Sequence, residues 1–254
     1  MNETSYFKFT PSVWIVPTLL FLGIWGVFFV EEFFNVGLSH FGILPRTFSG
    51  LIGILLSPLL HGDIHHLLNN SLPLFILTAA LVYFYRNLSL KVLFYGILLS
   101  GFITWLIGRD SYHIGASGLI YVLVSFIFFK GLITKYYRLM ALSMTVVMIY
   151  GGMVWYVFPD VDKTISWEGH LGGLIAGYIF AIRFKTPDYQ KELVYDWQKP
   201  DYDPSEDKFM QRFDENGNFV NPPPPEPEQI PEQSLGFRVI YDFIPEKKDV
   251  EKEN

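Results

Sequence analysis

The stretch WEGHLGGLIAGYIF, residues 167 to 180, is apolar and rich in glycine, yet it contains a histidine near its beginning. Gly169, Gly173 and Gly177 recur every four residues, a spacing that lets a neighbouring helix approach closely inside a membrane. Burying His170 beside these glycines costs free energy unless a polar partner compensates for it. The stretch therefore predicts a closely packed membrane helix that carries a functional polar group.

The composition of the whole chain indicates a membrane protein. Of its 254 residues, 50% are hydrophobic and 17% are charged, whereas soluble domains contain about 25% charged residues. Five windows of 17 to 22 residues contain no charged side chain, and each is close to the ~20 residues that cross a bilayer. These windows, which predict five membrane spans, are 9–30, 64–85, 92–108, 111–129 and 139–159.

A sixth span is predicted at residues 169–182, which are shorter than the other five windows. They comprise 14 uncharged residues, but Trp167 can anchor the segment at one membrane interface, and Arg183 and Lys185 can reach the other. Residues 47–60 are also uncharged but contain two glycines and a proline, so we expect an interfacial or half-inserted element there. The predicted fold is an all-α membrane bundle of six transmembrane helices.

Basic residues predict the orientation, because those in short loops are concentrated on the cytoplasmic side. With the N-terminus inside, eight basic residues lie in the inner segments and three in the outer loops. The inner residues are Lys8, Arg86, Lys91, Lys130, Lys135, Arg138, Arg183 and Lys185, and the outer ones are Arg46, Arg109 and Lys163. We therefore expect both termini in the cytoplasm, which requires an even number of spans and supports the sixth.

The composition changes after Lys185, which predicts a membrane domain at residues 1–185 and an acidic, largely irregular cytoplasmic tail at residues 186–254. The tail contains 17 acidic and 8 basic residues, so its net charge is −9, against +3 for the membrane domain. Its segment NPPPPEPEQIPEQ, residues 221–233, is rich in proline, and we expect it to be extended or disordered.

The absence of cysteine excludes disulfides and a cysteine protease. The first residues, MNETSYFKFTPS, lack the basic and apolar regions of a signal peptide and the arginine bias of a transit peptide. We therefore expect an integral, multi-pass protein of a bacterial cytoplasmic membrane.

Three polar segments begin the second, fourth and sixth predicted spans, all at the outer face of the membrane. They are HGDIHHLLNN (61–70), GASGLIY (115–121) and EGHLGGLIAG (168–177). Close packing of the fourth and sixth spans would bring the Ser117 hydroxyl within hydrogen-bond reach of the His170 imidazole, as a serine nucleophile and its base require. His66 and Asn70 share one helix face, because four residues separate them.

Together, these three motifs resemble those of the rhomboid intramembrane serine proteases. That family carries a GxSG serine on the fourth span, a histidine on the sixth and an HxxxN pair on the second. The resemblance covers about residues 10–185. It implies that Ser117 is the nucleophile and His170 the general base, with no aspartate completing a triad, and that His66 and Asn70 stabilise the oxyanion.

The resemblance also implies supporting residues around this site. They are Tyr121, whose ring packs on the catalytic imidazole, His61, which matches a structural histidine, and Gly115 and Gly118, which flank the nucleophile. One feature departs from the family pattern. Many rhomboids carry a Trp-Arg pair in the loop after the first span, whereas residues 35–60 contain Arg46 and no tryptophan. The acidic tail has no counterpart in the six-span core.

The function that the resemblance implies is hydrolysis of transmembrane segments of other membrane proteins. A membrane helix satisfies its own backbone hydrogen bonds, so the substrate must unwind locally before a carbonyl can be attacked. The expected partners are single-pass transmembrane substrates and the lipid bilayer. We expect no cofactor, no metal and no nucleic acid, and the sequence does not define an oligomeric state.

Two alternatives remain open from the residues alone. An inactive relative would bind membrane helices without cleaving them. A zinc site is the other alternative, because His61 and His65 have the i, i+4 spacing of helical ligands, and Asp63, His66 and His170 could lie nearby.

Three further polar residues are assigned to structural positions. We expect His65 and His113 at the loop surface, and we expect Lys130 to snorkel at the inner membrane interface.

Overall fold

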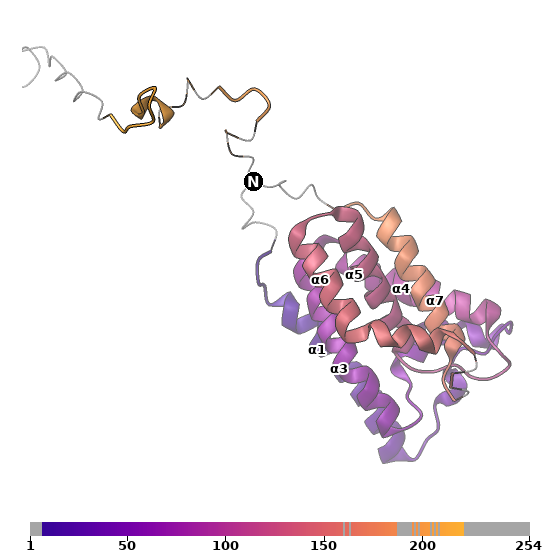
Figure 1. The fold of residues 1–254 in the computed structure, drawn as a ribbon. Coiled ribbons are helices and arrows are strands. Elements are labelled where there is room, and N and C mark those ends of the chain that lie inside the picture. Colours follow the sequence, from indigo (N-terminus) through magenta and orange to yellow (C-terminus); the bar gives the residue numbers. More distant parts are fainter. Residues whose placement is uncertain are drawn as a thin grey trace, which may run out of the picture. The chain divides into compact units, whose positions relative to one another are not determined.

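The computed structural model of the chain describes residues 7–159, 161–162 and 164–186, and, in the tail, residues 195, 197, 199–203, 205, 207 and 209–220. The chain forms two compact units, Met1–Leu193 and Val194–Asn254. The first unit is a bundle of helices (Figure 1). The described residues form helices and two isolated β-bridges but no β-strand, so the prediction of an all-α fold is confirmed.

Within the described part of the chain, five helices are long and apolar enough to cross a membrane. They are α1 (Ser12–Phe34), α3 (Ile64–Phe84), α4 (Arg86–Ile107), α5 (Ser117–Thr134) and α6 (Tyr137–Tyr150), the last with its continuation, the 3-10 helix η5 (Gly151–Val157). These helices overlap the five uncharged windows of the sequence. The prediction of a polytopic membrane bundle is therefore consistent with the structure.

The fifth of these helices changes its geometry near its C-terminal end. α-Helical hydrogen bonding ends at Tyr150, and the seven residues of η5 follow, beginning with the pair Gly151 and Gly152. Glycine is a poor α-helix former because ordering its backbone costs more entropy than for any other residue. The glycine pair is thus the local reason why the α-helix stops there.

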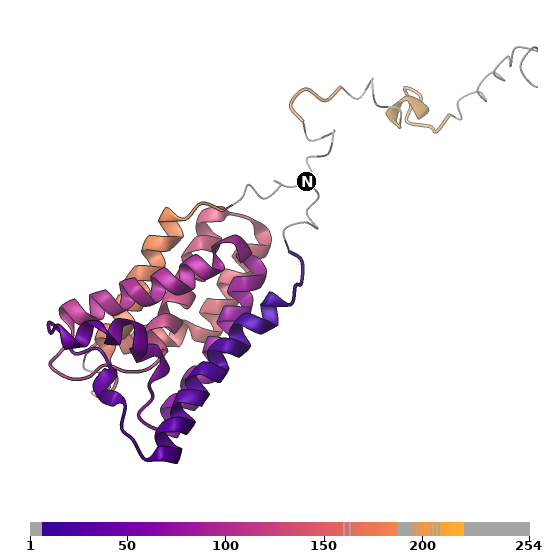
Figure 2. The same ribbon diagram turned by 180° about the vertical axis from the view of Figure 1, so that it is seen from behind.

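The helix predicted as the sixth span is α7 (Trp167–Arg183), which is 17 residues long. It packs along α5 and α4, as the two opposite views in Figures 1 and 2 show. A Cβ atom on Gly173 would overlap the carbonyl oxygen of Gly118, and one on Gly177 would overlap that of Val122. The backbones of α5 and α7 are therefore in direct contact, which these two glycines permit.

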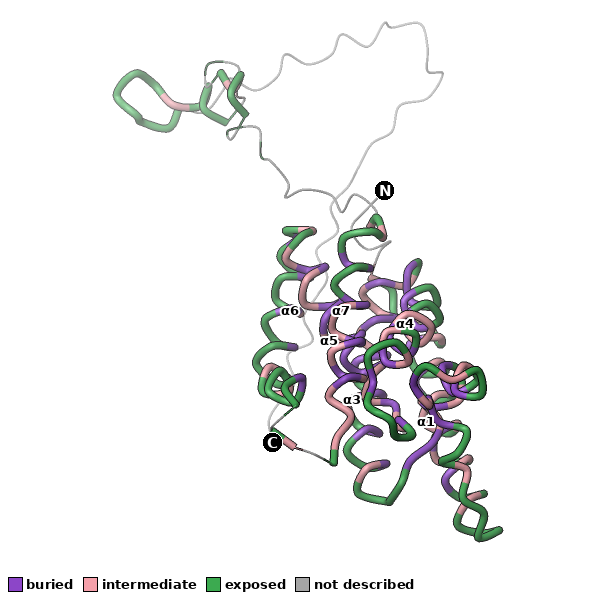
Figure 3. The backbone as a smooth tube through the Cα atoms, turned by 90° about the vertical axis from the view of Figure 1, so that its right-hand side faces the viewer, coloured by how far each residue is buried: buried purple, intermediate pink, exposed green. Residues whose placement is uncertain are grey.

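The core of the bundle is centred on α5. This helix contacts α3, α4, α6 and α7, and Leu123, Phe126 and Ile127 are fully buried in it. In contrast, α6 lies at the edge of the bundle and is mostly exposed (Figure 3). The helix that positions the GASG motif is thus the best supported element of the structure.

The loop between α1 and α3 contains η2 (Ser39–Phe41) and then three further short helices. These are η3 (Ser49–Leu51), α2 (Gly53–Leu56) and η4 (Ser57–Leu59). None is long enough to cross a membrane, and α2 packs against α4. Residues 47–60 therefore form a compact element that does not span the membrane.

Lys130 does not snorkel, so that prediction was wrong. Its side chain is only 4% exposed, and Nζ donates to the carbonyl oxygens of Ala181 (3.0 Å) and Phe184. These carbonyls lie at the C-terminal end of α7, where the last residues of a helix have no intrahelical donor. Lys130 thus caps α7 from the neighbouring helix α5.

The second unit contains the short helix η7 (Met210–Arg212) and a turn closed by a β-bridge between Phe213 and Phe219. Inside this turn Asp214 Oδ1 accepts hydrogen bonds from the backbone N–H groups of Asn216 (2.9 Å) and Asn218 (2.8 Å). The proline-rich segment predicted to be irregular, residues 221–233, lies outside the described residues.

Candidate active site

Ser117 and His170 face each other across the contact between α5 and α7. Ser117 is the first residue of α5, and His170 lies in the first turn of α7. The Ser117 hydroxyl oxygen is 3.0 Å from Nε2 of His170, whose side chain is almost fully buried. The direct contact between Gly118 and Gly173 brings the two helices close enough for this hydrogen bond.

The other nitrogen of the His170 ring determines which tautomer is present. Nδ1 is 2.9 Å from the carbonyl oxygen of Tyr156 in η5. A carbonyl can only accept, so Nδ1 carries the proton and donates, and Nε2 has a free lone pair toward Ser117. This is the tautomer that a base needs in order to accept the proton of the Ser117 hydroxyl. Residue types do not indicate this acceptor, because every residue carries a carbonyl.

Tyr121 holds the His170 ring from one side. The two rings are stacked, with centroids 4.2 Å apart and planes inclined by 15°. The Tyr121 hydroxyl donates to the carbonyl oxygen of Met153 over 2.5 Å. Two carbonyl groups of η5, those of Met153 and Tyr156, therefore fix both rings.

His66 and Asn70 lie on α3 beside the loop that precedes Ser117. In that loop Gly115 has a φ of +111°, a conformation that favours glycine. A Cβ atom on Gly115 would lie 2.6 Å from His66 Nε2 and 3.6 Å from Asn70 Nδ2. Asn70 Nδ2 is buried and has no hydrogen-bond partner among the described residues. The structure thus brings the His66 imidazole and the Asn70 amide to the backbone next to Ser117.

His61 packs against His66 at the start of α3. It is buried, and its ring lies edge-on to that of His66 with centroids 5.0 Å apart. Burial lowers the pKa of His61 to about 4. His65 is exposed, as predicted, but it lies in the first turn of α3 and not in a loop. Among the described residues no three His, Cys, Asp or Glu side chains converge as metal ligands would. The zinc alternative therefore has no ligand set in this part of the chain.

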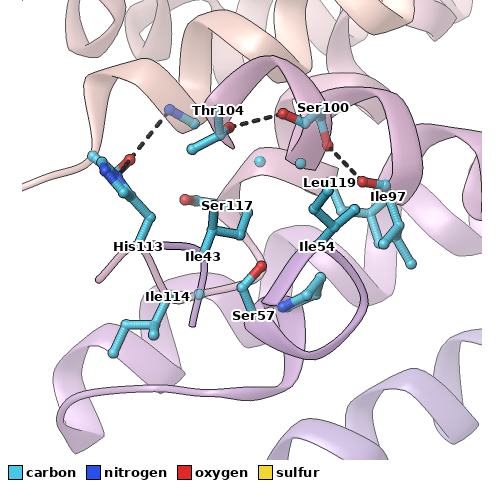
Figure 4. A pocket seen from close by; sticks show the side chains of 16 residues that line it. Ile43, Ile54, Ser57, Ile97, Ser100, Thr104, His113, Ile114, Ser117 and Leu119 are labelled. Atoms are coloured by element: carbon cyan, nitrogen blue, oxygen red, sulfur yellow. Dashed lines mark hydrogen bonds between the residues drawn. The ribbon is translucent and has the colours of Figure 1, made fainter. Parts of the chain in front are cut away.

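A cavity of about 30 Å³ lies beside Ser117 (Figure 4). A buried water needs about 10–15 Å³ of such space and two to four polar partners. A cavity of about 30 Å³ therefore has room for about two waters. Its polar lining consists of Ser57, Ser100, Thr104, His113, Ser117 and Ser166.

His113 is buried, so its assignment to the loop surface was wrong. Only 4% of the residue is exposed, and Nδ1 lies 2.6 Å from the hydroxyl oxygen of Ser166. The backbone of His113 pairs with that of Ile43 in an antiparallel bridge, which draws the residue inward. The sequence could have identified Ser166 as a helix cap, because it stands directly before the apolar run of α7, where a capping serine is common. It does not indicate His113 as the partner of that serine.

A second contact that sequence reasoning missed joins Arg109 to Glu168. Glu168 is 1% exposed, and its Oε1 accepts from the backbone N–H of Arg109 (3.1 Å) and lies 3.5 Å from the guanidinium Nε. An acidic residue in the otherwise apolar stretch WEGHLGG could have indicated a basic partner, because a buried carboxylate requires one.

Arg46 fastens the loop after α1, which lacks the Trp-Arg pair. Its guanidinium donates to the carbonyl oxygen of Gly108 (2.6 Å) and pairs with Asp110. The indole N–H of Trp105 in α4 donates to the carbonyl oxygen of Thr47 (2.8 Å). A tryptophan and an arginine from different segments thus connect this loop to the end of α4.

Comparisons with known proteins identify the family of this chain. Residues 49–186 match the family model of the rhomboid domain. The chain belongs to the rhomboid family. This rhomboid is 34% identical over 157 residues to an uncharacterized protein of Mycobacterium tuberculosis and to one of Mycobacterium bovis, which covers 58% of this chain and 65% of each relative.

A third relative is an uncharacterized protein of Mycobacterium leprae. It is 30% identical over 169 residues, which covers 63% of this rhomboid and 66% of the relative. The matched part of the rhomboid therefore spans slightly less than two thirds of the length of these relatives. The match to the family model establishes the family membership.

Proposed function

We propose that this rhomboid is an intramembrane serine endopeptidase, with Ser117 as the nucleophile and His170 as the general base. The observation that carries the proposal is the chain of hydrogen bonds from the Ser117 hydroxyl to Nε2 of His170 (3.0 Å) and from Nδ1 to the Tyr156 carbonyl (2.9 Å). A nucleophile, a base and a group that orients the base are the parts that serine catalysis needs.

In the proposed reaction the Ser117 oxygen attacks the scissile carbonyl while His170 Nε2 takes the hydroxyl proton. His170 then gives this proton to the leaving amine, and water hydrolyses the acyl-enzyme. His66, the Asn70 amide and the backbone N–H of Ser117 stabilise the oxyanion. The unpartnered Nδ2 of Asn70 supports this role, because a buried donor without an acceptor is costly unless a ligand provides one. Removing one oxyanion donor typically lowers the rate by ~10²- to 10³-fold.

The proposed substrates are transmembrane segments of single-pass membrane proteins. Their backbone carbonyls are bound within a helix, so cleavage requires local unwinding, which small or helix-breaking residues near the scissile bond favour. A deep site between membrane helices would be reached sideways from the lipid. The small cavity beside Ser117 can hold water for the deacylation step.

The proposed topology has α7 as a sixth span and both termini in the cytoplasm of a bacterial cell. The excess of basic residues in the inner segments supports this orientation. The acidic residues 186–254 would then form a cytoplasmic tail. The site would open toward the outer face of the membrane, since the second, fourth and sixth spans begin there.

The test is cleavage of a single-span substrate by the rhomboid reconstituted in liposomes. We expect cleavage by the wild type, no cleavage by Ser117→Ala or His170→Ala, and no effect of a chelator. Ser125→Ala is the matched control, because Ser125 lies on the same helix and its hydroxyl donates to the Leu174 carbonyl of α7 (2.7 Å). This variant loses a bond between the same two helices and should retain activity within a few-fold.

Two outcomes would contradict the proposal. Binding of the substrate helix without cleavage by the wild type would indicate an inactive relative. Loss of cleavage on chelation would indicate a metal enzyme.

A further inference from the structure

Ser117 and His170 can react only if the loop before α5 and the start of α7 keep their relative positions. A second hydrogen bond joins these two segments. His113 lies four residues before Ser117 in the loop that leads into α5, and Ser166 lies four residues before His170 at the start of α7. His113 Nδ1 and the Ser166 hydroxyl oxygen are 2.6 Å apart. This contact therefore parallels the one between Ser117 and His170.

The donors and acceptors of this contact can be assigned from its neighbours. His113 Nε2 lies 3.1 Å from the carbonyl oxygen of Arg109, which can only accept, so Nε2 carries the proton. Nδ1 then accepts the hydroxyl proton of Ser166. The Ser166 oxygen accepts in turn from the backbone N–H of Gly169 (3.2 Å) as the N-cap of α7. A single neutral tautomer of His113 satisfies the whole chain of hydrogen bonds.

Burial favours this neutral form of His113. Desolvation is the largest cause that lowers its pKa, and the neighbouring charges of Glu168, Arg109 and Arg46 partly oppose one another. The neutral ring keeps the acceptor that the Ser166 hydroxyl requires.

Hydrogen bonds hold the backbone around His113 in place, and this fixes the position from which its side chain reaches Ser166. Its N–H and C=O pair with the C=O and N–H of Ile43, each over 2.9 Å. Two residues later, the N–H of Gly115 donates to the carbonyl oxygen of Ser57 over 2.9 Å. The pair between Arg109 and Glu168 joins the same loop to the same turn of α7. A rigid loop thus holds the end of α7 that carries His170.

We infer that His113 and Ser166 are a positioning pair that sets the distance between Ser117 and His170. The inference rests on the proposed function, because it assigns these residues to the reaction through the two groups that they position. Neither residue touches the reacting atoms in this role. A displacement of about 1 Å in a reacting group can cost 10²-fold in rate, so loss of the pair should slow the reaction without abolishing it.

The first readout is the rate at which a fluorophosphonate probe labels Ser117, together with kcat and KM for a single-span substrate. We expect His113→Ala and Ser166→Ala each to lower the labelling rate and kcat by about 10- to 100-fold, with KM changed less than about two-fold. His113→Asn should restore most of the rate, because its Oδ1 takes the place of Nδ1 as the acceptor. The double variant should be no slower than the slower single variant.

The second readout does not depend on activity. Nitrogen-15 NMR of labelled histidines in micelles, with the His170 signals identified by His170→Asn, reports the hydrogen bond at Nε2. In His113→Ala this signal should move toward that of Ser117→Ala, which lacks the hydroxyl, and in His113→Asn it should stay near the wild-type position. If the wild type neither cleaves nor labels, the proposed function fails, and the NMR comparison still decides whether the pair positions His170.

A structural control separates positioning from general stability. Trp25→Phe removes the hydrogen bond from the Trp25 indole to Ser71 (3.0 Å), which joins α1 to α3 away from the site. If Trp25→Phe lowers the unfolding temperature as much as His113→Ala does, it should still be labelled at the wild-type rate. Each of three results would overturn the inference: equal slowing in this control, an Asn variant as slow as the Ala variant, or unchanged His170 signals in His113→Ala.

Discussion

His170, Tyr121 and Lys130 are buried polar side chains, and each donates to a main-chain carbonyl oxygen. Leaving such a group buried without a partner would cost about 1–3 kcal/mol, and more for a charged one. The carbonyls of Met153 and Tyr156 belong to the 3-10 helix η5, and that of Ala181 belongs to the last turn of α7. At the residue scale, main-chain carbonyls of neighbouring helices therefore satisfy these three buried side chains.

His61 should contribute to the pH dependence of stability. Burial, and then the neighbouring His66, lower the pKa of His61 from its ordinary value of 6.5 to about 4. As the pH falls below 6.5 the unfolded chain binds a proton that the folded protein does not bind, so the free energy of unfolding falls until about pH 4. A shift of this size corresponds to about 3 kcal/mol.

Unfolding in micelles between pH 7.5 and pH 4 measures this effect. His61→Gln should lose stability less steeply than the wild type over this range. His65→Gln, a change at an exposed neighbour, should follow the wild-type profile. Parallel profiles for the wild type and His61→Gln would show that His61 does not titrate in this way.

At the element scale, α5 and α7 are joined at three levels along their length. The bond between Ser117 and His170 lies at one end, that from Ser125 to the Leu174 carbonyl in the middle, and that from Lys130 to the Ala181 carbonyl at the other end. Between these levels the two backbones touch at glycines. The proposed nucleophile and base are therefore carried by one rigid helix pair.

Gly173→Ala should move α5 and α7 apart. The added Cβ would overlap the Gly118 carbonyl oxygen and lie 2.7 Å from Cβ of Tyr121. Overpacking of this kind costs about 1–3 kcal/mol, and the resulting shift should lower kcat by at least about 10-fold. Unfolding temperature and cleavage rate measure the two effects.

Gly26→Ala is the control for this change, since nothing lies within 4 Å of a Cβ at that position in α1. Alanine there should leave activity unchanged and should not destabilise the helix, because alanine has the higher helix propensity. Equal activity of Gly173→Ala and the wild type would contradict the close packing of α5 and α7.

At the scale of the whole membrane unit, many large apolar side chains are exposed on the surface. Large side chains on α1 and α6 are more than half exposed, among them Trp14, Leu19, Leu22, Phe29, Met148 and Ile149. Soluble monomers rarely expose so many large apolar side chains, so this surface indicates contact with lipid. The lipid of the membrane thus covers the apolar side chains that the helices leave exposed.

The orientation can be measured with single cysteines, because the natural chain has none. Ser111 lies in the exposed loop between α4 and α5, and Lys135 in the exposed loop between α5 and α6. We expect an impermeant maleimide to label Ser111→Cys in intact bacterial cells, and Lys135→Cys only after permeabilisation. The opposite pattern would reverse the proposed topology.

The sequence predicted the features that side-chain type and spacing encode. Uncharged windows predicted the long helices, and the spacing of Gly173 and Gly177 predicted a close helix contact. The structure brings Ser117 and His170 within hydrogen-bond distance, as the order of the motifs suggested.

The features that the sequence did not predict depend on tertiary contacts or on the main chain. His113 and Lys130 were misplaced, because the partners that allow their burial are distant in sequence. The 3-10 geometry of η5 and the carbonyls that it offers leave no signature in residue type beyond a glycine pair.

The carbonyl of Tyr156 has an evolutionary consequence. In most serine hydrolases the group that orients the base is a side chain, so a single codon change can delete it, whereas every amino acid at position 156 supplies the same oxygen. The Tyr156 side chain itself is 41% exposed. Saturation mutagenesis would therefore record position 156 as tolerant, and natural sequences are free to drift there while the oxygen remains in use.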